Sequence, residues 1–425
     1  MTGIKRFSTA VICVAMLFVC VGMTAEVHAA AVKLSRKSVT LDIDKSAALK
    51  VSGTKKAVRW SSSNKKIVVV SKKGKITAKK AGTATVYAKV AKKTLKCKVS
   101  VRALTKYWSK DSVSAKRLRS YVAKVTNKAN GEFIPKNDRI AVFDMDGTLT
   151  CETYFTYYDT MMFIEYCLKD HPDKVSEDLK EAAAAIKPGY KADLTLAQNF
   201  ARAYAGMTID EYYDYAVEFG KRNTASFTNM RYIDGFYLPM VELVEYLYDN
   251  GFTVYVVSGT ERTVTRAIVA NSPIKDYVTP DHVIGTEFEV KQKGHETEQY
   301  NTDYKYADGD ELVITGGFIQ KNLNSNKCIF IEREVGKRPV LAFGNSGSDT
   351  SMMNYAIDKR NKYASEAFML VNDDKVREWG PEDWASQSEK WAGMGYTPVS
   401  MAQDFGKIYP AGIVPSDSQY QEIAG

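Results

Sequence analysis

The chain has 425 residues, of which 45% are hydrophobic and 26% are charged. This length allows two or three domains, and the composition is that of a globular protein and excludes a disordered chain. The formal net charge of +9 is unevenly distributed, because residues 31–103 contain 18 lysines and three arginines against two aspartates, a net charge of +19. Residues 1–30 add +1, so residues 104–425 carry −11, and the sequence predicts a basic module joined to an acidic one.

The first 30 residues have the pattern of a secretory signal peptide. Lys5 and Arg6 precede an apolar run at 10–22, and small residues suited to cleavage stand at 29–30. The apolar run is short for a membrane-spanning helix, so we expect no transmembrane segment after cleavage. The predicted location is secreted, or associated with the cell surface and cell wall.

Cysteine and histidine are scarce in the rest of the chain. No two cysteines have the C-x-x-C spacing, so neither a zinc site nor a disulfide framework is indicated, and buried single thiols are expected. No serine–histidine arrangement suggests itself either, which leaves catalysis to carboxylates. The cysteines after the leader are Cys97, Cys151, Cys167 and Cys328, and the histidines are His171, His282 and His295.

Residues 31–103 show about seven short alternating apolar runs separated by turn residues, which predict a small β-sandwich. The elements W-S-S-S at 60–63, G-K-I-T-A at 74–78 and A-G-T-A-T-V at 81–86 resemble the group 2 bacterial immunoglobulin-like domain. The lysines alternate with buried positions and cover the solvent face. They form either an ordinary solvated surface or a surface that retains the protein on an anionic cell-wall polymer. Specific nucleic-acid binding is not expected, because interleaved surface aromatics and a recognition motif are lacking.

The first motif with candidate catalytic residues in the acidic module is I-A-V-F-D-M-D-G-T-L at 140–149. Residues 140–143 predict a buried strand, and Asp144 and Asp146 follow it on the same side of an extended backbone. Two carboxylates aimed at one volume repel each other unless a cation relieves them, which indicates a hard divalent metal such as Mg²⁺. The metal would in turn bind phosphate.

The apolar strand followed by D-M-D-G-T-L resembles the first motif of the haloacid dehalogenase (HAD) superfamily. The resemblance implies a doubly wound α/β core with a parallel sheet. It also implies that Asp144 attacks phosphorus and forms an aspartyl-phosphate, while Asp146 protonates the leaving alcohol and later activates water.

The stretch from Thr150 to Ser258 has helical periodicity and no strand signal. In this superfamily, an insertion after the first motif is a helical cap, expected here at roughly 151–235. Glu152, Tyr154 and Tyr157 stand at its entrance, where an acidic group among tyrosines could hold an amine or quaternary ammonium. Aromatic residues at helical spacing also suit an ordinary core, so these three residues are weak candidates for substrate specificity.

A second apolar strand at 252–257 ends at Ser258-Gly259-Thr260, and a helix is expected to begin near Glu261. This placement predicts a hydroxyl and backbone amides at a helix N-terminus, which is an anion site. It resembles the second HAD motif, so Ser258, Gly259 and Thr260 are the expected phosphate-binding residues. Residues 283–319 predict β-hairpins and resemble the hairpin of phosphoserine-phosphatase-like members.

Two lysines compete for the third motif of the family. Lys327 opens a helical stretch at 328–335, and Lys337 lies beside the proline that starts the strand at 340–343. We favour Lys327, because phosphoserine-phosphatase-like members carry the lysine in such a position, whereas Lys337 is expected on the remote face. The motif lysine would hold Asp144 and phosphate together.

The strand at 340–343 runs into G-N-S-G-S-D at 344–349, which resembles the acidic fourth motif. Phosphoserine phosphatases typically have an aspartate directly after the first glycine, and this chain has Asn345. The amide can still bind Mg²⁺ or its water, which leaves Asp349 as a second charged ligand or as an anchor behind the metal. The expected metal ligands are therefore Asp144, Asp146, Asn345 and Asp349.

Together these motifs predict a secreted Mg²⁺-dependent phosphomonoesterase in residues 104–425 that acts on a small phosphorylated metabolite, with amine-bearing metabolites among the candidates. One alternative is HAD chemistry on a halide or phosphonate, and Asp146 argues against a dehalogenase, because halide needs no proton donor. The other alternative is a surface adhesion protein that binds phosphorylated ligands without efficient turnover.

Overall fold

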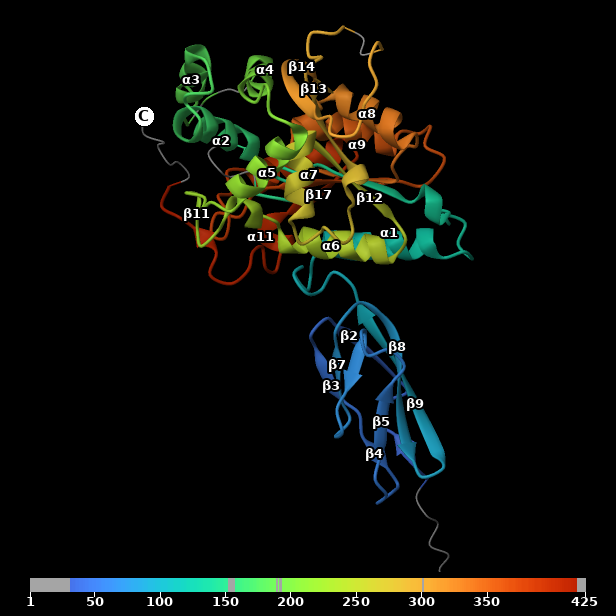
Figure 1. The fold of residues 1–425 in the computed structure, drawn as a ribbon. Coiled ribbons are helices and arrows are strands. Elements are labelled where there is room, and N and C mark those ends of the chain that lie inside the picture. Colours follow the sequence, from blue (N-terminus) through green and yellow to red (C-terminus); the bar gives the residue numbers. More distant parts are fainter. Residues whose placement is uncertain (1–30, 152–156, 189, 191–192, 300–301, 419–425) are drawn as a thin grey trace, which may run out of the picture.

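The computed structural model describes residues 31–425 except 152–156, 189, 191–192, 300–301 and 419–425. The predicted leader, Glu152 and Tyr154 therefore lie outside the described residues. Figure 1 shows two bodies, a slender β-module and a larger α/β domain. This is the predicted fold class, an all-β N-terminal module followed by a parallel-sheet core.

The β-module is a sandwich whose buried alternate positions, such as Val86, Val99 and Ile76, form one core between two sheets. One sheet has the order β2-β9-β8-β5 and the other β3-β7-β6, and β1 pairs with β4. The strands are β1 (Lys33–Leu34), β2 (Ser38–Asp42), β3 (Ser46–Ala48), β4 (Val51–Ser52), β5 (Arg59–Ser62), β6 (Val68–Val70), β7 (Lys75–Ala78), β8 (Gly82–Val90) and β9 (Lys93–Arg102). One of the short apolar runs, at residues 47–51, is split between β3 and β4.

The α/β domain is built on a seven-stranded sheet of order β14-β13-β12-β10-β15-β16-β17. Its central strand β10 (Ile140–Phe143) is fully buried and pairs in parallel with β12 (Thr253–Glu261) and β15 (Leu341–Gly344). β16 (Glu366–Val371) and β17 (Thr397–Ser400) extend the parallel sheet on one side. On the other side, β13 (Val283–Gln292) is parallel to β12 and forms one antiparallel hairpin with β14 (Leu312–Gln320).

Helices cover both faces of this sheet, because β10 alternates its side chains between two cores. Ala141 and Phe143 face a core that includes α1 (Val113–Thr126), α6 (Leu238–Asp249) and α7 (Arg262–Ala270). Ile140 and Val142 face the core shared with α8 (Ser325–Val335), α9 (Thr350–Ile357) and α10 (Trp384–Gly393). The rings of Phe143, Phe343 and Phe368 stack across three neighbouring strands, with centroids 4.2 and 5.2 Å apart.

The first helices that follow β10 along the chain lie at the upper left in Figure 1, within the residues where the sequence predicts a cap. A short π-helical turn, Tyr166–Asp170, continues α2. The strand β11 was not expected, and it pairs with β18 (Val414–Pro415) near the end of the chain. The elements are α2 (Tyr158–Glu165), α3 (Glu177–Ala184), α4 (Leu194–Ala203), α5 (Ile209–Gly220) and β11 (Phe227–Thr228).

The junction between the two bodies is held by contacts of the linker and by contacts of the β-module itself. The buried Glu242 of α6 accepts hydrogen bonds from the backbone N–H groups of Thr105 (2.9 Å), Lys106 (3.2 Å) and Tyr107 (2.9 Å). From the β-module, Lys80 forms ion pairs of 2.9 Å with Glu245 and Asp249 of the same helix. One buried carboxylate and one surface lysine therefore set how the β-module meets the α/β domain.

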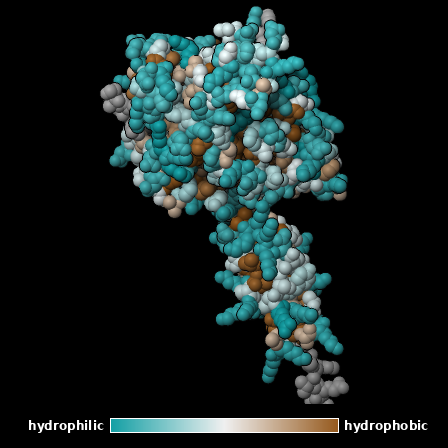
Figure 2. All heavy atoms as spheres, in the orientation of Figure 1, coloured by the Kyte–Doolittle hydropathy of each residue, from teal (hydrophilic) through white to brown (hydrophobic). Residues whose placement is uncertain are grey.

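The surface seen in Figure 2 is mostly hydrophilic, with hydrophobic side chains scattered over it. Within the described part of the chain, no helix combines the length and the apolar character needed to cross a membrane. The four described cysteines are free thiols, and Cys97, Cys151 and Cys167 are buried.

Candidate active site

The first predicted motif forms a tight turn at the carboxyl end of β10. The N–H of Asp144 still donates to Phe343 O (2.9 Å), and the N–H groups of Leu149 and Thr150 then fold back onto Met145 O. Gly147 sits at φ 78°, in the left-handed region that favours glycine. The turn presents Asp144 and Asp146 to the same cavity.

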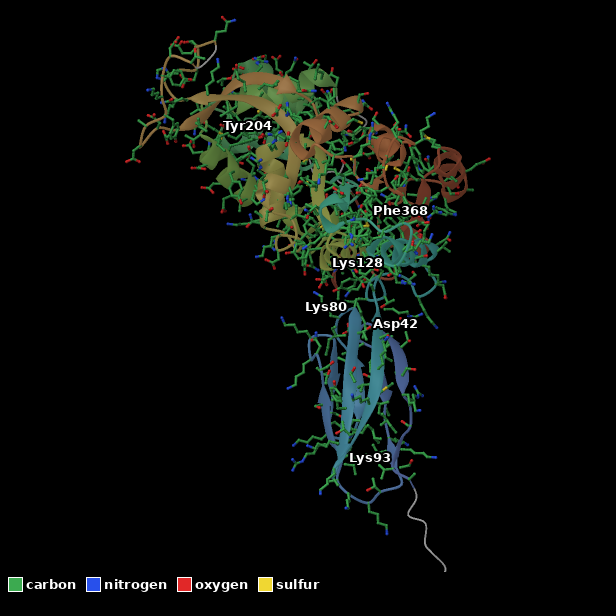
Figure 3. All side chains as sticks on the ribbon, turned by 90° about the vertical axis from the view of Figure 1, so that its right-hand side faces the viewer. Asp42, Lys80, Lys93, Lys128, Tyr204 and Phe368 are labelled. Atoms are coloured by element: carbon green, nitrogen blue, oxygen red, sulfur yellow. The ribbon has the colours of Figure 1, made fainter. Side chains whose placement is uncertain are left out.

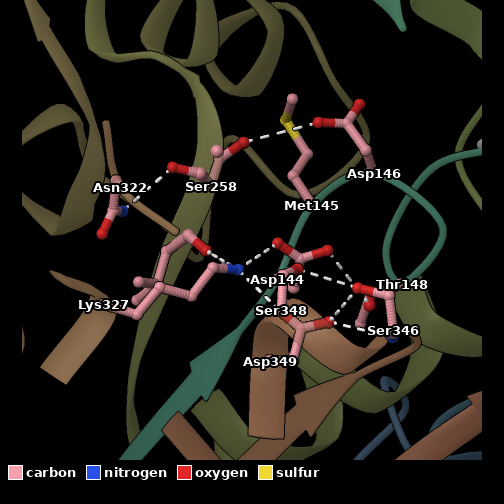
Figure 4. Close-up of polar contacts among 12 residues, drawn as sticks. Asp144, Met145, Asp146, Thr148, Ser258, Asn322, Lys327, Ser346, Ser348 and Asp349 are labelled. Atoms are coloured by element: carbon pink, nitrogen blue, oxygen red, sulfur yellow. Dashed lines mark hydrogen bonds and ion pairs between the residues drawn. The ribbon is translucent and has the colours of Figure 1, made fainter. Parts of the chain in front are cut away.

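Lys327 lies beneath this turn with its side chain fully buried. Its Nζ donates to Asp144 Oδ1 (2.5 Å), Asp349 Oδ1 (2.7 Å) and Val257 O (2.9 Å), as Figure 4 shows. The competing Lys337 lies on the remote face, where it pairs with the half-buried Asp138 at 2.9 Å. The structure thus brings Lys327 to the aspartates and keeps Lys337 away from them.

Electrostatics in this cluster are dominated by burial. Burial raises the pKa of Asp144 to about 8, and the charge of Asp349 adds to this effect, while Lys327 opposes it. For Lys327 burial acts to lower the pKa, but the charges of Asp144 and Asp349 outweigh it and raise this pKa. Because one buried ammonium faces several carboxylates, an additional cation would stabilise the ionised form of Asp144.

Asp349 takes part in this cluster from behind the cavity. It is fully buried, and its Oδ2 accepts hydrogen bonds from the N–H groups of Asn345 and Ser346, both at 3.1 Å. A Cβ at Gly344 would lie 2.6 Å from the Asp349 Cβ, so the glycine permits this close approach. Of the two roles expected for Asp349, its contacts fit the anchor that holds Lys327 and the loop after β15.

Asn345 does line the cavity. The Thr148 hydroxyl lies 3.5 Å from Asp144 Oδ2 and 3.4 Å from Asn345 Oδ1, so these two oxygen atoms face one spot. No cluster of three or more histidine, cysteine, aspartate or glutamate side chains suited to a metal exists among the described residues. Any metal here would use carboxylate and amide oxygens completed by water, a donor set that suits Mg²⁺.

The Ser258-Gly259-Thr260 segment differs from the expectation. β12 continues through it to Glu261, and the amides at the start of α7 are capped by the Glu261 carboxylate, which accepts from Thr263 N (2.6 Å) and Val264 N (3.0 Å). These two amides are therefore occupied, while phosphate binding by Ser258, Gly259 and Thr260 stays a prediction, and Gly259 and Thr260 line the cavity. Thr260 Oγ1 donates to Asp146 Oδ2 (3.0 Å), and the buried Ser258 hydroxyl lies 3.5 Å from the same oxygen.

A cavity of about 670 Å³ opens above the two aspartates, between them and the first helices after β10. Tyr157 lines it, as do three charged residues that the sequence analysis missed, namely Asp159 in α2, Asp193 at the start of α4, and Lys321. Asp159 is 4% exposed, and its pKa is raised by burial and lowered less strongly by Lys321. No motif marks these residues, although an acidic residue within an apolar helix such as α2 could have indicated a side chain that faces a polar cavity.

A parallel sheet with two aspartates after its central strand and a buried lysine beneath them defines a hydrolase of the HAD type. The sequence profile of the haloacid dehalogenase-like hydrolase family matches residues 141–354, and that of the group 2 bacterial Ig-like domain matches residues 28–101. The chain belongs to the haloacid dehalogenase-like hydrolase family.

Solved structures with a similar arrangement were also found, all of them distant. A functionally unknown protein from Anaerococcus prevotii is 14% identical, with 70% of this chain and 94% of that chain covered and a TM-score of 0.42. Cytosolic 5'-nucleotidase IIIB bound to cytidine is 11% identical over 69% and 88% of the two chains, with a TM-score of 0.35. A phosphoserine phosphohydrolase-like protein from Francisella tularensis is 15% identical over 55% and 88%, with a TM-score of 0.29. No curated protein matched the chain.

Proposed function

We propose that this protein is a Mg²⁺-dependent phosphomonoesterase that acts through an aspartyl-phosphate. The observation that carries the proposal is the contact of Lys327 Nζ with Asp144 Oδ1 at 2.5 Å beneath the cavity. A buried ammonium at this place holds Asp144 in position and stabilises the negative charge of a phosphoryl group transferred to it. A HAD-type reaction that displaces a halide needs no proton donor, so it would leave Asp146 without a catalytic role.

The proposed roles follow from the side chains that face the cavity. Asp144 is the nucleophile, and its Oδ2 with Asn345 Oδ1 would hold Mg²⁺, which supplies positive charge against phosphate oxygens when bound. Asp146 delivers a proton to the leaving alcohol and later takes one from water. Thr260, which donates to Asp146 Oδ2, keeps that carboxylate oriented toward the cavity.

We propose further that the leaving group carries an amine. Asp159 and Asp193 place two carboxylates on the cavity wall, beside Tyr157 and apolar residues of α4. Burial raises the pKa of Asp159 and so disfavours its ionised form. A bound ammonium would stabilise the ionised carboxylate, and the carboxylate would in turn neutralise the buried ammonium. Tyr157 adds a ring face that suits a quaternary ammonium.

The experiment is release of phosphate by the full chain with Mg²⁺, first from p-nitrophenyl phosphate and then from a panel of phosphomonoesters with and without an amine. Asp144→Asn is expected to abolish release, because the amide is not a nucleophile, while the fold remains intact by circular dichroism. Full activity of that variant would refute the mechanism. Ligand binding without turnover in the wild type would favour the binding protein instead.

The chain outside the catalytic site suggests where the enzyme acts. We propose a leader at 1–30, an immunoglobulin-like module at 31–103 and a hydrolase domain at 104–425, with secretion followed by retention at the cell surface. The net charge of +19 over residues 31–103 supports electrostatic retention on an anionic cell-wall polymer. Retention that does not weaken as salt rises would contradict this part of the proposal.

A further inference from the structure

The two acidic residues of the β-module lie at its end nearest the catalytic domain. Asp42, the last residue of β2, pairs with Arg102, the last residue of β9, at 2.6 and 3.0 Å. Asp44 N bonds to Ala78 O just beyond it. Figure 3 shows Asp42 and Lys80 at this junction and Lys93 at the opposite end of the module.

Among the described residues of the β-module, the charged side chains at the opposite end are all cations. β9 starts at Lys93, and its ten residues place that end about 30 Å from Arg102. Arg59 of β5 lies opposite Lys89 of β8 in the strand register, and Lys93 Nζ donates a hydrogen bond to Val32 O, next to Lys33. We call the exposed cations at this end the distal cluster, which consists of Lys33, Lys55, Lys56, Arg59, Lys89, Lys92 and Lys93.

We propose that the distal cluster is the docking end of the protein for a flexible, base-free polymer that carries a phosphate on each repeat. The proposal rests on the retention proposed above and assigns it to one end of the module. With both carboxylates about 30 Å away, the cluster has no internal counter-charge within a Debye length.

The composition of the cluster supports a phosphate polymer. Six of its seven cations are lysines, which act as point charges on flexible stems and tolerate varied phosphate positions, whereas the rigid fork of arginine would require a fixed bidentate geometry. A nucleic acid would need exposed rings for base stacking. The only aromatic residues of 31–103, Trp60 and Tyr87, are half-buried, and Trp60 packs on Gly74.

The test compares two triple variants of the full chain that each remove three exposed lysines. The distal variant is Lys55→Gln/Lys92→Gln/Lys93→Gln, and the matched control is Lys45→Gln/Lys66→Gln/Lys79→Gln at the other end. Binding to immobilised poly(glycerol phosphate) is measured over a salt series, alongside single-stranded DNA and phosphatase turnover. The distal variant should bind at least about tenfold more weakly with a shallower salt dependence, and the control should change less than threefold.

Equal weakening of both variants would overturn the docking end while leaving general electrostatic retention standing. Absence of polymer binding by the wild type would overturn both. Tighter binding of DNA than of the polymer would overturn the choice of partner. Turnover should stay at the wild-type level in both variants, since neither triple touches the catalytic domain, so the phosphatase proposal is judged separately.

Discussion

Lys327 is the residue whose charge has most consequence, because it is fully buried between Asp144 and Asp349. Lys327→Met would leave two buried carboxylates without their cation, a change that costs about 3–5 kcal/mol of unfolding free energy. Phosphate release should fall below detection, and the melting temperature should drop. Lys327→Arg keeps the charge and should restore part of the stability without full turnover.

The matched control for this prediction is Lys337→Met on the remote face. Its pair with Asp138 is largely solvent-exposed, with side-chain exposures of 47% and 29%, so we expect a change of less than about 1 kcal/mol and normal turnover. Loss of activity in Lys337→Met together with an active Lys327→Met would reverse the choice between the two lysines.

Asn345 lends itself to a gain-of-function test. Asn345→Asp would place a second carboxylate oxygen near Asp144 Oδ2, where the Thr148 hydroxyl now bridges the two side chains. The added charge should lower the Mg²⁺ concentration for half-maximal activity by about tenfold, as measured by metal titration of phosphate release. Asn345→Ala should shift it upward, and an unchanged requirement in both variants would place the metal elsewhere.

Residues with a sequence motif were the predictable part of the site. Asp144, Asp146 and Lys327 could be proposed because strand ends and helix starts bring such residues together at one sheet edge. Asp159 and Asp193 could not, because their approach to the cavity depends on how the helices after β10 pack on the core, and Lys321 follows the edge strand β14 in a segment without a motif. That packing is set by many weak apolar contacts that no short pattern records.

At the scale of elements, Glu261 ends β12 and caps α7, and it gives the stability a pH dependence. Burial raises its pKa to about 7 from an ordinary value of 4.5. Between these two values the folded state binds the proton more strongly than the unfolded state, so the unfolding free energy falls as pH rises through this window.

Glu261→Gln removes this titration. Between pH 5 and pH 8 the unfolding free energy of the wild type should fall by up to about 3 kcal/mol relative to that of the variant. Thermal unfolding of both proteins at each pH measures this difference. Glu287→Gln, at a partly buried salt bridge on β13, is a control that should follow the pH profile of the wild type. Parallel pH profiles for wild type and Glu261→Gln would show that the carboxyl group is already ionised at pH 5.

Regular elements were predictable where the apolar pattern was long. The central strands β10 and β15 lie within one residue of the ranges expected at 140–143 and 340–343, and most of the described stretch between Thr150 and β12 is helical, as its periodicity predicts. The boundary after β12 was wrong because Ser258-Gly259-Thr260 has the composition of a turn, yet Thr286 Oγ1 donates to Gly259 O (2.6 Å) and the strand continues. β11 and β18 are two-residue strands that only a long-range pairing defines.

At the scale of the whole molecule, Glu242 fixes the linker between the two bodies. Glu242→Gln replaces one accepting oxygen by a donor amide that faces backbone N–H groups, so about 1–3 kcal/mol of stability should be lost. We expect faster proteolysis near residues 104–107 and a broader shape distribution in small-angle scattering. Glu245→Gln on the same helix breaks only a partly exposed pair and should change neither measurement noticeably.

The free thiols noted in the fold have a consequence for biogenesis. Cys97, Cys151 and Cys167 are each no more than 1% exposed, and each lies in a hydrophobic core rather than opposite another sulfur atom. Their burial raises the pKa of Cys97 and Cys167, which suppresses the reactive thiolate. The described chain can therefore reach its native state without oxidative folding catalysts, and it keeps the same covalent structure in reducing and in oxidising surroundings.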